Sequence, residues 1–275
     1  MLDILTILLM TVPVGVLGAL TGLGGGSILV PILVALGVPV KYAIAASMVS
    51  IIATSSGAGA SSLREGIVNV KAGMYLAIFT VIGAIVGATL SNFVNPRFLY
   101  FAFAAFLLTA FLGLRRHLRE EVPSGTLQDG LSRRLELEGR YYDKSLKREV
   151  GYKMRRPLLA GAGMLVAGLA AGLLGIGGGA FKMSIQENVL RMPTKVSSTT
   201  SNFIIGMTAL AGASVYFASG QLYLGLAAPM AVGTAVGAVI GGRVLNRLPN
   251  RGVKVLFLVI VTYLIIQMLY KGVTS

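Results

Sequence analysis

Long apolar blocks recur along the whole chain. They are roughly 17–23 residues long, enough for a helix to cross about 30 Å of hydrocarbon. Only 12% of the residues are charged, against about a quarter in soluble domains, and the mean hydropathy is +0.80. These features predict a polytopic all-α membrane protein. The blocks are residues 4–20, 43–62, 72–92, 98–114, 158–175, 203–218, 222–242 and 253–270, with shorter pieces at 27–38 and 180–190.

The two halves of the chain are copies of one unit. A shift of 153 residues places Gly22–Gly26 on Gly175–Gly179, and after one inserted residue the register continues for more than fifty residues. Sustained self-similarity of this kind is the signature of an internal repeat. We therefore expect a first repeat at 1–114, a linker at 115–157 and a second repeat at 158–275. Further matched pairs are Pro39 with Pro193, Lys41 with Lys195, Thr54 with Thr208, Asn92 with Asn246 and Arg97 with Arg251.

Each unit opens with an interrupted helix. Residues 4–39 would be about 54 Å long as one helix, which is too long for one crossing. The glycines at 22–26 stand in the middle, where helix is costly. We expect a broken or re-entrant helix pair followed by three transmembrane helices. The whole chain would then have about eight spans and up to ten helical segments. The first block continues into the glycine motif, so we expect it to be a retained span rather than a signal peptide.

The distribution of positive charge predicts that the repeats are inverted. If each broken pair begins and ends on one face, and residues 115–157 are cytoplasmic, 21 of the 24 Lys and Arg residues lie inside. Parallel repeats would leave about nine outside, against the positive-inside rule. Inverted repeats with broken helices are typical of secondary transporters. We therefore expect both termini to lie outside.

Between the repeats, the charged linker has two interpretations. The stretch from Leu131 to Val150 could form a surface helix at the lipid headgroups, or the linker could be a solvated connection with basic flanks. The net charge of +14 is not a nucleic-acid signal, because the positive residues gather at span ends and in this linker. We expect no nucleic-acid partner; a homodimer and a monomer are both open.

Several kinds of chemistry lack their residues. The chain has no Cys, and its one His, His117, stands among arginines just past a span. We therefore expect no metal site, no cofactor and no catalytic residue. An intramembrane enzyme would lack its functional groups, and no ATP-binding motif is present.

The paired glycine strings suggest an anion site. Glycines at a helix N-terminus let backbone N–H groups face an anion, and the helix dipole adds favourable potential. Alternatively, the strings only permit the breaks and tight packing, as we expect of the spacings Gly83–Gly87 and Gly233–Gly241. The candidate residues in the strings are Gly24, Gly25, Gly26 and Ser27 in the first repeat, and Gly177, Gly178 and Gly179 in the second.

The second short arm carries two charges that the first lacks. Lys182 replaces Leu29 three residues past the glycines. A lysine in the membrane is costly and faces a wet or protein interior, so it could supply positive charge to an anion. It could instead snorkel to the interface. Glu187 is the single candidate for proton coupling through a carboxylate, or else a structural partner of Lys182 or Arg191.

Small polar residues open the helix after each short arm. Six of them are consecutive at 197–202, and Ser47 and Ser50 stand in the equivalent part of the first repeat. They could cap the helix and donate to anion oxygens, or make interhelical hydrogen bonds. The candidates are Ser47, Thr200, Ser201 and Asn202.

These motifs resemble the TauE/SafE, or sulfite exporter, family of permeases. The resemblance covers both repeats and rests on Gly22–Ser27 with Pro31, on Gly175–Gly179 with Lys182, and on Met192, Pro193, Lys195 and 200–208. Two features depart from the family pattern: Ser184 stands where Pro is usual, and Gln186 and Glu187 occupy a normally apolar stretch. The resemblance implies a membrane transporter of sulfite, sulfonates such as sulfoacetate, or related anions.

The leading hypothesis is therefore a secondary carrier of a small sulfur-containing anion. A passive anion channel, or a carrier of a non-sulfur organic anion, would share these features. A membrane scaffold would leave the polar run at 197–202 unexplained.

Overall fold

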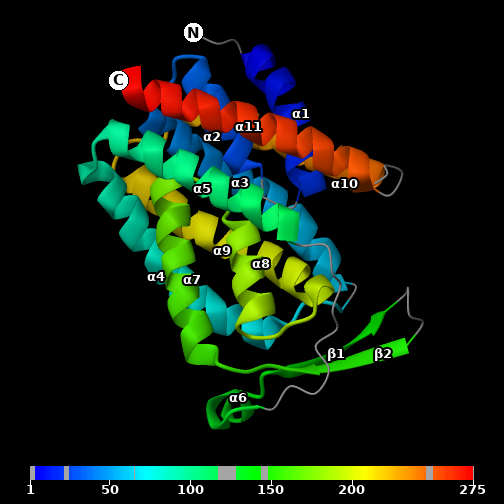
Figure 1. The fold of residues 1–275 in the computed structure, drawn as a ribbon. Helices are drawn as coiled ribbons and strands as arrows, with labels where there is room; N and C mark the ends of the chain where they lie inside the picture. Colours follow the sequence, from blue (N-terminus) through cyan, green and yellow to red (C-terminus); the bar gives the residue numbers. More distant parts are fainter. Residues whose placement is uncertain are drawn as a thin grey trace.

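A bundle of long helices makes up most of the protein, seen in a computed structural model that describes residues 4–21, 25–64, 66–116, 128–143, 148–245 and 250–274 (Figure 1). The first half contains α1 (Ile4–Thr21), α2 (Gly26–Ala35), α3 (Val40–Arg64), α4 (Val70–Phe93) and α5 (Pro96–Arg116). The second half contains α7 (Pro157–Leu174), α8 (Gly179–Asn188), α9 (Thr194–Ala218), α10 (Leu224–Leu245) and α11 (Asn250–Thr274). The order long–short–long–long–long occurs in both halves.

Apolar helices confirm a polytopic membrane protein. In the described part of the chain, four segments are long and apolar enough to cross a membrane: Val70–Phe93, Pro157–Leu174, Thr194–Ala218 and Leu224–Gly241. Three shorter apolar helices are Leu5–Gly18, Gly26–Ala35 and Pro96–Leu108. The expected total of about eight spans stays a prediction.

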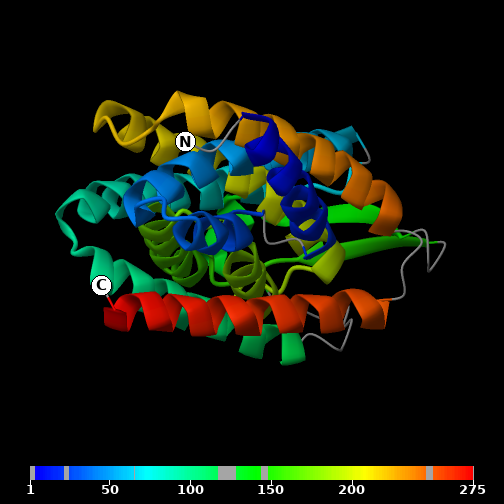
Figure 2. The same ribbon diagram turned by 90° about the horizontal axis from the view of Figure 1, so that it is seen from above.

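The pattern of helix contacts stays the same when each helix of α1–α5 is replaced by its counterpart in α7–α11. The most extensive contacts are between α4 and α7 and between α1 and α10, and this replacement converts one pair into the other. The pairs α4 with α9 and α10 with α3 swap in the same way, whereas α3 with α9 and α5 with α11 each map onto themselves. In Figure 2, α1 lies against α10, and α11 runs along the opposite side of the bundle.

Two of these pairs join equivalent helices that run in opposite directions. Gly206 of α9 lies beside Ser55 of α3, and Gly212, further along α9, lies beside Met48, earlier in α3. Likewise Gly272 near the end of α11 contacts Phe101 near the start of α5. Helices α3 and α9, and helices α5 and α11, therefore pack antiparallel.

Close backbone contact holds α4 to α7 and α1 to α10, as expected for the small-residue spacings. A Cβ at Gly83 would lie 2.2 Å from the carbonyl oxygen of Leu165, and one at Gly87 would lie 2.2 Å from that of Leu169. On α10, a Cβ at Gly237 would lie 2.1 Å from the carbonyl oxygen of Val12. These glycines serve helix packing, as small residues do between membrane helices.

The linker does not form the surface helix that was one of its two interpretations. The described part contains a short helix, α6 (Gly130–Arg134), and an antiparallel hairpin of β1 (Glu138–Asp143) and β2 (Arg148–Lys153). The all-α expectation and the helix over Leu131–Val150 are therefore wrong in this region. The hairpin forms because alternate side chains, Val150 and Tyr152 of β2 with Tyr141 of β1, are buried on one face, which is the period of a strand.

This hairpin is docked against one end of the bundle, and the carboxyl end of α11 lies at the other end (Figure 1). Leu137, Tyr141 and Tyr152 share a buried cluster with side chains of α4, α7, α8 and α9. Asn69 accepts a hydrogen bond from Ala72 N as the N-cap of α4, and its Nδ2 donates to the Tyr152 hydroxyl at 3.0 Å. In the linker, a hydrogen bond from the Lys71 ammonium at the start of α4 lowers the pKa of the Glu136 carboxyl.

We expect Gly87→Ala to destabilise the protein, since its methyl group would overlap the backbone of α7. Overpacking of this kind costs about 1–3 kcal/mol. The matched control is Gly57→Ala in α3, where a Cβ meets nothing within 4 Å and an exposed helical glycine gains about 0.5–1 kcal/mol from alanine. Thermal unfolding in detergent should show a lower midpoint for the first variant alone. Equal midpoints would contradict the close α4–α7 contact.

Candidate anion-binding site

The two glycine breaks lie against each other. Gly25 caps the start of α2 with φ 69°, and Gly178 caps the start of α8 with φ 65°, a left-handed conformation that favours glycine. A Cβ at Gly26 would lie 2.7 Å from the carbonyl oxygen of Gly175. Backbone therefore meets backbone between the halves. Gly24 lies outside the described residues.

Ser47 joins the two halves at this contact. Its Oγ lies 2.7 Å from the carbonyl oxygen of Gly175 and 2.7 Å from that of Ile44 in its own helix. The glycine break leaves the Gly175 carbonyl at the end of α7 without a helical partner, and the Ser47 hydroxyl donates to it. In this conformation Ser47 holds the break together.

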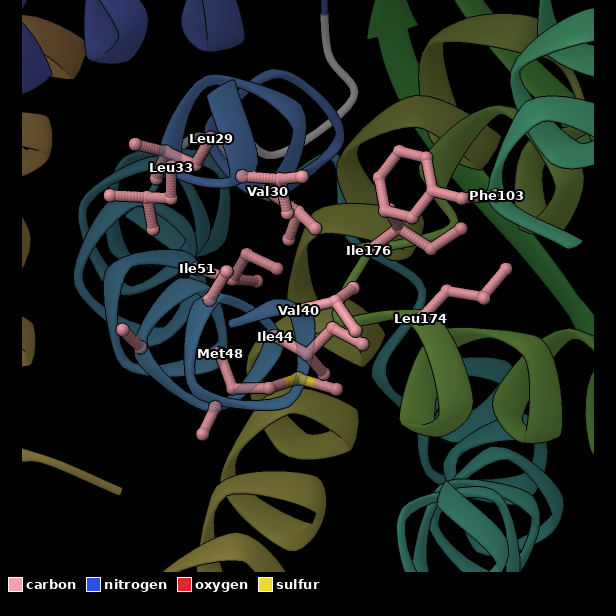
Figure 3. Close-up of a cluster of buried hydrophobic side chains, with 14 of the residues drawn as sticks. Leu29, Val30, Leu33, Val40, Ile44, Met48, Ile51, Phe103, Leu174 and Ile176 are labelled. Carbon is pink, nitrogen blue, oxygen red and sulfur yellow. The ribbon is translucent and has the colours of Figure 1, made fainter. Parts of the chain in front are cut away.

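The space around the breaks is filled by apolar side chains (Figure 3). Val30 of α2 points toward Ile176, which lies between α7 and α8, and toward Phe103 of α5. Ile51 of α3 contacts Gly26, and Gly177, Gly178 and Gly179 are buried. Ser27 is also buried, and its Oγ has no hydrogen-bond partner among the described residues. The glycines bring the backbones together.

Lys182 is the charged group of this region. Its side chain is fully buried, so the snorkelling interpretation does not fit. The lysine leans back toward the start of α8, with its Cε 3.8 Å from a Cβ built at Gly178. Nζ donates to Thr208 Oγ1 of α9 at 3.0 Å, and Thr208 in turn donates to the carbonyl oxygen of Ile204 at 2.7 Å.

One helical turn further along α8, Gln186 continues the polar contact with α9. Gln186 is fully buried, and its Nε2 donates to Ser201 Oγ at 2.8 Å. Within the described residues, Gln186 Oε1 and the buried Ser197 Oγ have no hydrogen-bond partner. Buried polar groups are normally paired, so this amide oxygen and this hydroxyl, which can also donate, mark an incompletely satisfied site. We call the set Lys182, Gln186, Ser197, Ser201 and Thr208 the polar row.

The structure separates the remaining predicted residues from the polar row. Thr200 accepts a hydrogen bond from Asn69 N at 3.2 Å and faces α4, and Asn202 is partly buried elsewhere on α9. Glu187 is partly buried and stands five residues after Lys182, about 140° around the helix. Of the predicted residues, Lys182 and Ser201 belong to the polar row.

Gln186, Ser197 and Thr208 were not among the predicted site residues. Their spacing indicates shared helix faces, because Lys182 and Gln186 are four residues apart and so are Ser197 and Ser201. What the sequence does not show is that these two faces meet. The equivalent face of α2 carries Leu29 and Leu33, both buried and apolar, so the α8 part of the polar row belongs to the second half alone.

Apolar packing covers the end of the polar row that contains Gln186 and Ser197. Ile185 and Val196 flank Gln186 and Ser197 in the chain, and they belong to the same buried cluster as Leu137, Tyr141 and Tyr152 of the linker. The hairpin therefore packs at the end of the bundle where Gln186 and Ser197 lie.

Together these features define a multi-pass helical membrane protein with a lysine buried beside a helix break. The chain belongs to the family described as sulfite exporter TauE/SafE, whose family model matches residues 7–268. It is therefore a membrane transporter and not an enzyme.

Two curated relatives cover almost the whole chain. The probable membrane transporter protein YunE of Bacillus subtilis (strain 168) is 28% identical over 271 residues, 95% of each chain. The probable membrane transporter protein YdhB of the same organism is 26% identical over 252 residues, 91% of this chain and 92% of its own. No solved structure gives a significant match.

We expect Lys182→Leu to fold at least as stably as the parent protein, because leucine already occupies the equivalent position 29. Leucine removes the cost of burying an ionisable amine, and Thr208 still donates to the carbonyl oxygen of Ile204. Thr208→Val should instead lower stability by about 1–3 kcal/mol, since it leaves Nζ without its partner. Thermal unfolding in detergent measures both. A large loss for the leucine variant would show that Lys182 has a structural role.

Proposed function

We propose that this protein is a secondary carrier of a small sulfur-containing anion, sulfite or an organosulfonate such as sulfoacetate, across the cell (inner) membrane. The observation that carries the proposal is Lys182, a fully buried lysine beside the first turn of α8. Backbone N–H groups of that turn have no side-chain cap, and a helix N-terminus attracts negative charge. Lys182, Gln186, Ser201 and Ser197 offer further groups to the oxygens of one anion.

The inverted-repeat arrangement is part of this proposal. It is supported by the antiparallel packing of α3 with α9 and of α5 with α11, because equivalent helices of inverted repeats run in opposite directions. The charge distribution supports a cytoplasmic linker and external termini. The hairpin and the carboxyl end of α11 at opposite ends of the bundle agree with that topology.

The sulfur-containing substrate rests on the family description together with the charge of the site. A carboxylate would meet the same electrostatics, so a carrier of a non-sulfur organic anion is the second candidate. The buried apolar surroundings of the breaks favour a carrier over an open pore, because this conformation provides the closed barrier that alternating access requires.

Proteoliposomes loaded with sulfite, sulfoacetate or a dicarboxylate would test the proposal. Lys182→Leu should weaken anion binding roughly 10- to 100-fold, since a hydrogen bond to a charged group is worth about 1.5–3 kcal/mol. The matched control is Lys271→Leu in the last turn of α11, which should transport normally. Equal flux in both variants would remove Lys182 from the site.

Counterflow separates a carrier from a channel. Unlabelled substrate inside the vesicles should accelerate uptake of labelled substrate, because a carrier returns faster when loaded. Uptake that is independent of internal substrate would identify a passive pore.

A further inference from the structure

Among the residues that the structure describes, no ion pair joins Lys182 to an acidic side chain. Of the ten acidic residues, Asp3 stands at the amino end, Glu65 in the α3–α4 connection, and seven lie between 120 and 149. The tenth, Glu187, follows Lys182 by five residues and points to another side of α8. A buried charge is stable only when it is paired and hydrogen-bonded, so the resting site does not supply what an ammonium ion needs.

The helices that pack most closely against α8, which are α7, α9 and α5, add no carboxylate. Helix α7 has no ionisable side chain, and the Tyr216 hydroxyl of α9 donates to the carbonyl oxygen of Gly172. The ionisable residues of α9 and α5 are Lys195, Tyr216, Arg97, Tyr100, Arg115 and Arg116.

The hydrogen bond to Thr208 does not fix the charge of the lysine. Thr208 donates its own hydrogen to Ile204, so it accepts from Nζ. Both the ammonium ion and the neutral amine can donate that bond. An anion placed beside Nζ would supply the missing negative charge and favour the ammonium form.

We propose that Lys182 is the proton-coupling group of the carrier, taking up one proton when the anion binds and releasing it when the anion leaves. This inference rests on the proposed anion site. In the step, the neutral amine of Lys182 binds one proton from water on the loading side and becomes an ammonium ion paired with the anion. On the other side, anion and proton leave together and the amine is restored. Each anion is therefore carried with one proton.

The stoichiometry predicts how transport responds to voltage. Methanesulfonate has one negative charge, so its movement with one proton is electrically neutral. Sulfoacetate has two charges near pH 7.5, because its carboxyl is also ionised, and its movement with one proton carries one net negative charge. Uptake of methanesulfonate should be insensitive to membrane potential, and uptake of sulfoacetate should respond to it.

The test measures proton and anion entry together in proteoliposomes that contain a pH-sensitive dye. With the parent protein, we expect about one proton for each labelled methanesulfonate ion. Lys182→Arg keeps a positive charge that does not release its proton, so residual anion exchange should continue with a proton ratio near zero. Lys271→Arg is the matched control and should keep a ratio near one.

Glu187→Gln decides between the two ionisable groups of α8. A ratio near one in this variant assigns the proton to Lys182, even if Lys182→Arg is inactive. A ratio near zero assigns it to Glu187 and overturns the inference. Anion flux without protons in the parent protein also overturns it and leaves the carrier intact. Absence of flux for sulfite, sulfoacetate and methanesulfonate alike would instead contradict the proposed function.

Discussion

The structure depends on the backbone contact between the two glycine breaks. Gly26 and the Gly175 carbonyl lie too close for any side chain between them, and Ser47 ties that carbonyl to α3. A helix interrupted inside a membrane leaves N–H and C=O groups without partners, which is costly unless protein supplies them. At the second break, the first half therefore supplies the partner that the interrupted helix lacks.

Within this nearly symmetric frame, the chemistry is asymmetric. Leu29 and Leu33 pack in the first half, whereas Lys182 and Gln186 occupy the equivalent positions in the second. The buried leucines of α2 contribute to stability, whereas burying Lys182 and Gln186 in α8 costs free energy that packing does not return. A buried lysine without an acidic partner fits a group whose counter-ion arrives with a substrate. In the proposed mechanism, the same residue accounts for both anion binding and the uptake of a proton.

Much of the fold could be predicted from the sequence, because apolar block length, glycine breaks and the internal register are local signals. The position of Lys182 beside a break followed from the same register. The hairpin was missed because its strand signal, the alternation of Val150, Tyr152 and Met154, lies inside a charged segment that resembles a solvated linker. The partner of Ser47 was also beyond sequence reasoning, since the hydroxyl bonds a carbonyl 128 residues away. Similarly, the faces of α8 and α9 become one site only through tertiary packing.

Opposite orientation of the two halves is the central claim, and single-cysteine labelling tests it directly. The chain has no native Cys, so a thiol introduced at Val70 or at Leu224 is the only one present. These equivalent, exposed positions begin α4 and α10. A membrane-impermeant maleimide should label Leu224→Cys from outside intact cells and Val70→Cys only in inside-out vesicles. Labelling of both from the same side would contradict the inverted arrangement.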